Sequence, residues 1–141
     1  VVVEKFIVLS ANLLTKRIVN FLNFNGFVSW NVYNGGVYDP KIQKFRKNKS
    51  HKLGVFDICG FRERDGKHLE IEIKWKGDKM SPYQEKHFES LQNAGAICFV
   101  ARDFESFEIW FKELEQNKIG KNGNKGSGTK KTGHGFGDCI T

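Results

Sequence analysis

Two stretches decide the fold of this chain: Gly54-Val55-Phe56-Asp57-Ile58-Cys59-Gly60 and Leu69-Glu70-Ile71-Glu72-Ile73-Lys74-Trp75. Apolar and polar side chains alternate along both, which is typical of β-strands with one buried face. Between them lies Arg64-Asp65-Gly66-Lys67, and an Asp-Gly pair flanked by alternating strands is a strong hairpin signal. The sequence therefore predicts an antiparallel hairpin at the centre of the fold.

The turn also predicts which side chains meet. With the Asp-Gly pair as the two turn residues, Asp57 falls opposite Lys74 and Cys59 falls opposite Glu72. Directly opposed residues project from the same face, so we expect Asp57, Glu72 and Lys74 to converge and form a candidate metal and phosphate site. The other face is expected to be apolar and to carry Phe56, Ile58, Ile71, Ile73 and Trp75.

The length and composition predict one globular domain. The chain has 141 residues, 39% of them hydrophobic, which is enough for a real core. No apolar run is long enough to cross a membrane, and the first residues do not resemble a signal peptide, so we expect no membrane partner and a cytoplasmic location. The cysteines have no metal-type spacing and are interpreted as free thiols in a reducing compartment; they are Cys59, Cys98 and Cys139.

A formal net charge of +7 favours an anionic partner, with nucleic acid first. Residues 39–52 carry five Lys and one Arg against one Asp, and residues 117–141 carry five Lys against one Asp. These two segments hold most of the excess charge. The basic residues around the hairpin that we expect to contact phosphates are Lys41, Lys44, Arg46, Lys47, Lys49, Lys52, Lys76 and Lys79.

The remaining patterns predict helices both before and after the hairpin along the chain. The expected elements are a helix over 12–24, strands over 27–33, 54–60 and 69–75, a helix over 82–94, a strand over 96–101 that is buried on both faces, and a helix over 104–116. Residues 37–53 are expected to be mostly loop. The order α-β-β-β-α-β-α predicts an α/β fold with a mixed sheet flanked by helices, in a domain of residues 1–116. Residues 117–141 are rich in Gly and Lys and are predicted to be a disordered tail.

The helix over 82–94 has a specific start. Ser81-Pro82-Tyr83-Gln84 combines an N-cap serine, a proline in the first helical position and a glutamine in the capping-box position. Its inner face is expected to carry Tyr83, Phe88, Leu91 and Ala94. The histidines show no ligand spacing and are expected on the surface; they are His51, His68, His87 and His134.

The order of these motifs resembles the virus-type replication-repair nuclease (VRR-NUC) domain of the PD-(D/E)XK nuclease superfamily. The resemblance rests on Gly54-Val55-Phe56-Asp57, on Glu72-Ile73-Lys74 after a hairpin, and on Ser81-Pro82-Tyr83-Gln84 at a helix start, and it extends from about Asn12 to Leu114. It implies a metal-dependent endonuclease that hydrolyses DNA phosphodiesters, acts on branched or junction DNA and forms a homodimer.

The resemblance also implies the roles of individual residues. The side chains of Asp57 and Glu72 and the backbone carbonyl of Ile73 would bind Mg²⁺, for which Mn²⁺ can substitute. The metal would acidify a bound water and polarise the scissile phosphate. Lys74 would orient that water or neutralise the developing charge, and Gln84 would stand at the edge of the site.

Two features depart from the family pattern and leave alternatives open. Phe56 replaces the family's proline, and the predicted first helix has no acidic residue where the family often has a glutamate near the metal. A non-catalytic nucleic-acid-binding module that keeps the fold is therefore the alternative function. An Asp57–Lys74 ion pair is the structural alternative to a metal site, and Glu70 is the rival of Glu72 on the polar face.

Overall fold

The computed structural model describes residues 10–33, 35–46 and 52–117. These residues form three helices and six strands: α1 (Ala11–Phe24), β1 (Phe27–Asn31), β2 (Val37–Asp39), β3 (Lys44–Arg46), β4 (Ile58–Arg62), β5 (His68–Ile73), α2 (Pro82–Asn93), β6 (Ile97–Ala101) and α3 (Phe104–Gln116). The predicted tail lies outside the described residues apart from Asn117, which caps α3. None of the three described helices combines the length and apolar character of a membrane span.

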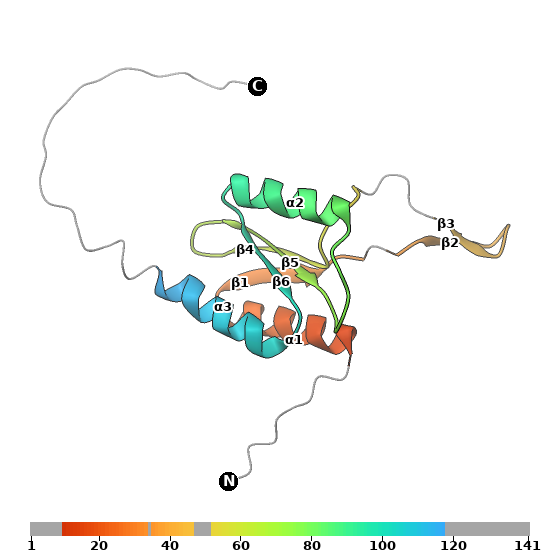
Figure 1. Cartoon of the computed structure of the whole chain (residues 1–141). Coiled ribbons are helices and arrows are strands. Elements are labelled where there is room, and N and C mark those ends of the chain that lie inside the picture. The colour runs from red at the N-terminus through yellow and green to blue at the C-terminus, as the bar shows by residue number, and fades with distance from the viewer. Residues whose placement is uncertain (1–9, 34, 47–51, 118–141) are drawn as a thin grey trace, which may run out of the picture.

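The central sheet has four strands in the order β1-β4-β5-β6. Only β5 and β6 are parallel, so the sheet is mixed, as predicted. In Figure 1, α2 lies on one side of this sheet, and α1 and α3 lie on the other. The fold is therefore a mixed α/β sandwich, and β5 is an inner strand with helices over both of its faces.

The main hydrophobic core lies between the sheet and the pair α1 and α3. Phe21 of α1 contacts the rings of Phe107 and Phe111 of α3 edge-on, at centroid distances of 5.5 and 5.0 Å. The sheet contributes Ile71 and Ile73, and Trp75 packs against this core. The last helix packs on this core through Phe107 and Phe111, and the predicted apolar face of the hairpin is confirmed apart from Phe56.

Phe56 corrects that expectation. Its ring is fully buried, but it contacts α2, edge-on to His87 at 5.3 Å and stacked on Phe88 at 6.0 Å between ring centroids. Residues 54–57 precede β4, so the strict alternation of the strand does not extend to Phe56. Phe56 therefore packs on the side of the sheet that was expected to be polar.

The register of the central hairpin also differs from the prediction. Cys59 pairs with Glu70 and Ile58 with Ile71, which shifts β5 by two residues relative to the expected pairing. The cause is a four-residue loop over 63–66 in place of a two-residue turn. The Arg62 N–H donates to the Lys67 carbonyl at 2.9 Å, and the Gly66 N–H donates to the Arg62 carbonyl at 2.8 Å. Because the shift is an even number of residues, the side chains of β4 and β5 keep their predicted faces.

Helix α2 begins as predicted, but its inner face carries only two of the four expected residues, Phe88 and Leu91. Ser81 is the N-cap, and its side chain and that of Gln84 form the reciprocal capping box. Tyr83 and Ala94 are exposed, whereas His87 is buried together with Leu91. The expectation that His87 lies on the surface is therefore wrong.

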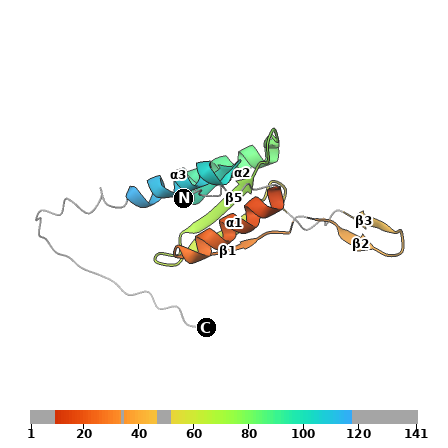
Figure 2. The ribbon, with the colours of Figure 1, turned by 90° about the horizontal axis from the view of Figure 1, so that it is seen from below.

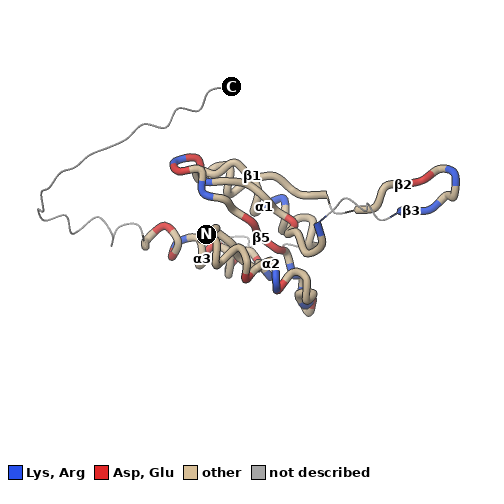
Figure 3. Tube along the Cα trace, turned by 90° about the horizontal axis from the view of Figure 1, so that it is seen from above, with Lys and Arg blue, Asp and Glu red and all other residues tan. Residues whose placement is uncertain are grey.

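The strand β6 and the segment over 37–53 differ from the predicted pattern. β6 is an edge strand, and its three central residues are only half-buried, whereas burial on both faces was expected. The segment expected to be loop contains a small hairpin of β2 and β3, which extends away from the sheet and its helices in Figures 1 and 2. Lys and Arg are prominent along this hairpin in Figure 3.

Candidate functional site

Glu72 is the centre of the candidate site. It is only 2% exposed, and it lies near the carboxyl end of β5 on the face covered by α2. Its Oε1 accepts a hydrogen bond from Gln84 Nε2 at 2.6 Å and lies 3.0 Å from Lys74 Nζ. Its Oε2 is buried and has no hydrogen-bond partner among the described residues. One oxygen of this carboxylate is thus fully engaged while the other is unused.

Asp57 is the second carboxylate of the site. The observed register, extended by one pair, places Asp57 opposite Glu72, whereas the predicted register placed it opposite Lys74. Asp57 is therefore closer to Glu72 than the prediction implied. Its Oδ2 accepts a hydrogen bond from the backbone N–H of Ile73 at 2.9 Å, and its carbonyl accepts one from Val32 at 2.7 Å. These bonds fix Asp57 against the end of β5, so the two predicted metal-binding carboxylates do come together.

The electrostatic state of Glu72 follows from this enclosure. Burial and the negative charge of Asp57 raise the pKa of Glu72 to about 7, and the hydrogen bond and charge of Lys74 only partly oppose them. A second positive charge near the two carboxylates would favour the ionised form. The site is therefore short of cationic charge in the metal-free protein.

Gln84 reaches this site from the first turn of α2. Its Oε1 accepts a hydrogen bond from the backbone N–H of Ser81 at 2.9 Å, while its Nε2 donates to Glu72. Gln84 thus caps the helix and also contacts Glu72. The capping box orients the amide that holds Glu72.

Gly54 brings the segment before β4 against the same turn of α2. Its φ is +81°, and a Cβ at this position would lie 2.4 Å from the carbonyl oxygen of Tyr83. A side chain would clash there, and the backbone conformation itself favours glycine. The glycine of the quoted motif therefore permits the close approach that sets Asp57 beside α2.

Glu70, the rival glutamate, belongs to a different cluster two residues back along β5. His68 Nε2 lies 2.8 Å from its Oε1, and His87 Nε2 lies 2.6 Å from its Oε2. Burial raises the pKa of Glu70, but the hydrogen bonds and charges of the two histidines outweigh burial and lower it overall. Glu70 is also paired opposite Cys59 and not beside Asp57. The geometry thus favours Glu72 for the site.

The predicted ion pair between Asp57 and Lys74 is not formed. Lys74 pairs with Glu72 instead, with its side chain 12% exposed, and its backbone N–H donates to the Ala101 carbonyl at 2.9 Å. The lysine is therefore held at the site by the end of β6.

The basic residues expected to contact phosphates fall into three groups. Lys41, Lys44 and Arg46 lie on or between β2 and β3, and Arg46 pairs with Asp39 at 2.7 Å. Lys76 and Lys79 are exposed in the loop before α2. The remaining three predicted residues are Lys52, whose Nζ lies 3.2 Å from His87 Nδ1, and Lys47 and Lys49, which lie outside the described residues.

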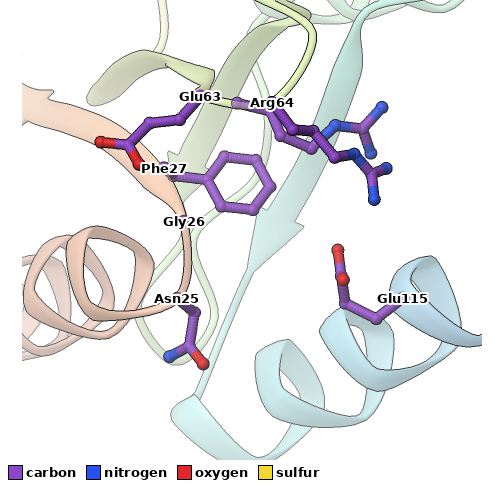
Figure 4. A pocket seen from close by; sticks show the side chains of 7 residues that line it. Asn25, Gly26, Phe27, Glu63, Arg64 and Glu115 are labelled. Carbon is purple, nitrogen blue, oxygen red and sulfur yellow. The ribbon is translucent and has the colours of Figure 1, made fainter.

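A separate pocket lies at the far end of β4. It has a volume of about 450 Å³ and is lined by Asn25, Gly26, Phe27, Arg62, Glu63, Arg64 and Glu115. In Figure 4 the side chains of Phe27, Arg64 and Glu115 surround it. Because Asp57 precedes β4 and this pocket lies where β4 ends, the pocket is not part of the candidate site.

The residues present at the candidate site fit a hard divalent cation. The donors are carboxylate oxygens, which Mg²⁺ prefers, and a buried oxygen of Glu72 is without a partner in the described part of the chain. The sequence missed the second cluster, because His68, His87 and Cys59 lack a recognisable spacing and come from different elements. The one feature of the sequence that points to this cluster is the alternation of the hairpin, which places Cys59 on its polar face.

Comparison with known proteins gives no family for this chain. No protein-family model matches it, and a search of curated proteins finds no significant match.

Proposed function

We propose that this protein is a Mg²⁺-dependent endonuclease that hydrolyses DNA phosphodiesters, with Asp57, Glu72, Lys74 and Gln84 at its active site. The observation that carries the proposal is the buried Oε2 of Glu72, which has no hydrogen-bond partner in the described part of the chain and lies beside the fixed carboxylate of Asp57. Leaving one buried oxygen of a carboxylate without a partner costs about 1–3 kcal/mol, and more when the group is ionised, unless a cation or a hydrogen bond compensates. A cation bound between Asp57 and Glu72 would offset this cost.

The metal would be held by the side chains of Asp57 and Glu72 and by the carbonyl of Ile73. When bound, Mg²⁺ supplies Lewis-acid polarisation of a phosphate and a more acidic water. The protein contributes the alignment, since the Ile73 N–H fixes Asp57 and Gln84 fixes Glu72. Both carboxylates are thus positioned before the substrate arrives, as a metal-assisted hydrolase requires.

Lys74 would contribute positive charge to the developing phosphorane. Its ammonium is largely enclosed and its backbone is fixed, so little reorientation is needed when a phosphate arrives. The cation would relieve Glu72 of its need for the lysine, and Lys74 could then turn to the phosphate oxygens. Proximity of the ammonium to both carboxylates is the feature that supports this role.

The hairpin of β2 and β3 supports nucleic acid as the substrate. Lys41 and Lys44 are exposed on it, and the rings of Tyr38 and Phe45 are 51% and 69% exposed, with centroids 5.3 Å apart. Basic side chains interleaved with exposed aromatic rings suit phosphates and unstacked bases. We extend the proposal to branched DNA, which exposes such bases, and to a homodimer, both implied by the resemblance to VRR-NUC domains.

A non-catalytic nucleic-acid-binding module is the second candidate function. The ion pair between Lys74 and Glu72 favours it, because a lysine can satisfy a buried glutamate without a metal. Helix α1 also contributes no carboxylate, since it contains no acidic residue. This candidate predicts DNA binding without cleavage.

The deciding experiment is a Mg²⁺ titration of cleavage on linear, flap and four-way DNA. We expect Mg²⁺-dependent cleavage that falls at least about a hundred-fold in Asp57→Asn and in Glu72→Gln. DNA binding, measured by fluorescence anisotropy in EDTA, should be unchanged or tighter, because each variant removes a negative charge near the polyanion. Glu89→Gln, which makes the same change at an exposed position on α2, is the matched control and should cleave normally.

Two results would contradict the proposal. Binding without cleavage by the unmodified protein on every substrate would support the non-catalytic module. Cleavage that survives Glu72→Ala but is lost in Glu70→Ala would show that the other glutamate of β5 holds the metal.

A further inference from the structure

A second group of metal-ligand side chains lies on the α2 face of the sheet, separate from Asp57 and Glu72. The register places Cys59 directly opposite Glu70, and His68 lies two residues before Glu70, on the same face of β5. One donor atom from each, Sγ of Cys59, a ring nitrogen of His68 and a carboxylate oxygen of Glu70, lie within 4.8 Å of one another. Three donors of different chemistry thus converge from two neighbouring strands.

We propose that Cys59, His68 and Glu70 form a binding site for a borderline transition-metal cation, Zn²⁺ in the first place. A thiolate and an imidazole favour Zn²⁺ or Co²⁺ over Mg²⁺, which prefers oxygen ligands alone. One thiolate and one carboxylate also balance the charge of a divalent cation. The candidate magnesium site has only oxygen donors, so the two sites select different metals.

The distances allow coordination after small side-chain movements. With metal–ligand bonds of about 2.0–2.3 Å, the ligand atoms of a tetrahedral site are about 3.3–3.8 Å apart. His68 Nε2 and Glu70 Oε1 are at 2.8 Å, so this pair must open slightly, and the widest separations must close by about an ångström. The His68 side chain is 48% exposed and can make this adjustment. Its exposure also leaves a fourth position open to water.

The surroundings of Glu70 hold it in a position to bind. His87 Nε2 lies 2.6 Å from Glu70 Oε2, the oxygen that His68 does not contact, and Lys52 Nζ lies 3.2 Å from the other ring nitrogen of His87. With the ammonium donating to Nδ1, the Nε2–H of His87 donates to the carboxylate. A histidine that orients a ligating carboxylate in this way is typical of the outer shell of a metal site.

Metal binding would exchange a proton for the cation. A cysteine binds metal as the thiolate, whereas without metal an ordinary cysteine is a thiol at neutral pH. When the metal–sulfur bond forms, the S–H bond breaks and the proton passes to solvent, with no change in oxidation state. The alternative is a purely structural cluster, in which His68 and His87 form hydrogen bonds with Glu70 and no metal is bound. In that case the Cys59 sulfur forms no metal bond.

Titration with Co²⁺ tests the site, because a cobalt–thiolate bond gives a charge-transfer band in the near ultraviolet. The full chain carrying Cys139→Ser serves as the parent, so that its remaining thiols are Cys59 and Cys98. We expect the band in the parent, its loss in Cys59→Ser, and its retention in Cys98→Ser. Cys98 is the matched control, since it is also half-buried and also lies opposite Glu70, on β6.

The histidines give a graded result. His87→Ala removes the residue that orients Glu70 and should weaken Co²⁺ binding about ten- to a hundred-fold. His68→Ala removes a ligand and should weaken Co²⁺ binding at least as much. Competition by Zn²⁺ but not by excess Mg²⁺ is expected. Absence of the band in the folded parent, or its persistence in Cys59→Ser, would overturn the proposal.

A second measurement avoids dependence on the folding of the variants. In the unmodified protein, Zn²⁺ should slow the alkylation of Cys59 relative to that of Cys98, as followed by mass spectrometry of peptides. Equal rates for Cys59 with and without Zn²⁺ would also overturn the proposal. Neither readout depends on nuclease activity, so this test stands apart from the proposed function.

Discussion

The pH dependence of stability in Glu72→Gln distinguishes a metal site from a structural ion pair. If Glu72 exists to pair with Lys74, its ionised form stabilises the fold, and the substitution should destabilise the protein at neutral and alkaline pH. If the site awaits a metal, ionised Glu72 costs stability in the metal-free protein. The raised pKa of Glu72, caused by burial and by Asp57, predicts the second outcome.

The size and sign follow from linkage. Glu72 has a pKa of about 7 when folded against an ordinary value of 4.5, so the folded state holds one proton more than the unfolded state between these values. Stability therefore falls as the pH rises through this window and is constant above it. The difference corresponds to roughly 3 kcal/mol at most, at 1.36 kcal/mol per unit of pKa. Gln at position 72 does not titrate and should abolish this loss.

The assay is urea denaturation of both proteins in EDTA at pH values from about 4.5 to 8.5. The substituted amide places an N–H₂ group where Oε2 is buried, which adds a roughly constant cost of about 1–3 kcal/mol. The test is therefore how the difference in the free energy of unfolding between the variant and the parent changes with pH. The constant cost does not affect that change. We expect the variant to gain stability relative to the parent as the pH rises, by up to roughly 3 kcal/mol.

Addition of Mg²⁺ at high pH supplies the complementary result. The cation should stabilise the parent and narrow its difference from Glu72→Gln, which has lost a ligand. A difference that is independent of pH, or one that grows in favour of the parent as the pH rises, would refute the reasoning. Glu72 would then be the partner of Lys74 and nothing more.

Three further substitutions test other parts of the structure. Lys74→Ala should lower the cleavage rate about 10²–10⁴-fold, and Lys74→Arg should restore little in single-turnover assays, because a planar guanidinium does not replace a compact ammonium. Gly54→Ala should lower the free energy of unfolding by about 2 kcal/mol or more, from positive φ and the clash with α2, whereas Gly77→Ala, where a Cβ meets nothing, should be nearly neutral in denaturant titrations. The hydrogen bond from Arg62 lowers the pKa of Asp65, so Asp65→Asn should reduce the melting temperature at neutral pH, with the difference shrinking as the pH falls below about 4; a constant difference would contradict this.

The sequence was sufficient to predict the face of most residues in the central hairpin, but not their partners. Alternation assigns each residue to a face, and a shift of two residues leaves that assignment unchanged. The turn decides the register, and here Asp65 closes a longer loop by accepting hydrogen bonds from Arg62 and from the backbone of Lys67. The Asp-Gly pair is compatible with either loop, so local chemistry alone did not determine the pairing.

The N-caps of α2 and α3 could be predicted from the sequence because their chemistry is local. Ser81 and Gln84 form the expected capping box, and Asp103 caps α3 through Ser106, as its sequence suggests. The inner face of α2 could not be predicted in the same way, because we assigned it from the apolar residues of the helix. Tyr83 is exposed and His87 is buried, because the face of the sheet beneath α2 is itself polar.

The polar character of that face explains why α2 carries one polar contact for each buried glutamate. Gln84 and His87 are three residues apart on a helix, about 4.5 Å along its axis, while Glu72 and Glu70 are two residues apart on a strand, about 6.6 Å. The spacings are close enough for Gln84 to reach Glu72 and for His87 to reach Glu70 when helix and strand run in opposite directions. Neither element shows this match alone, because it depends on the packing of α2 on β5. It follows that a shift of α2 along the strand would disturb both carboxylates together, so the close contact at Gly54 protects the two candidate metal sites at once.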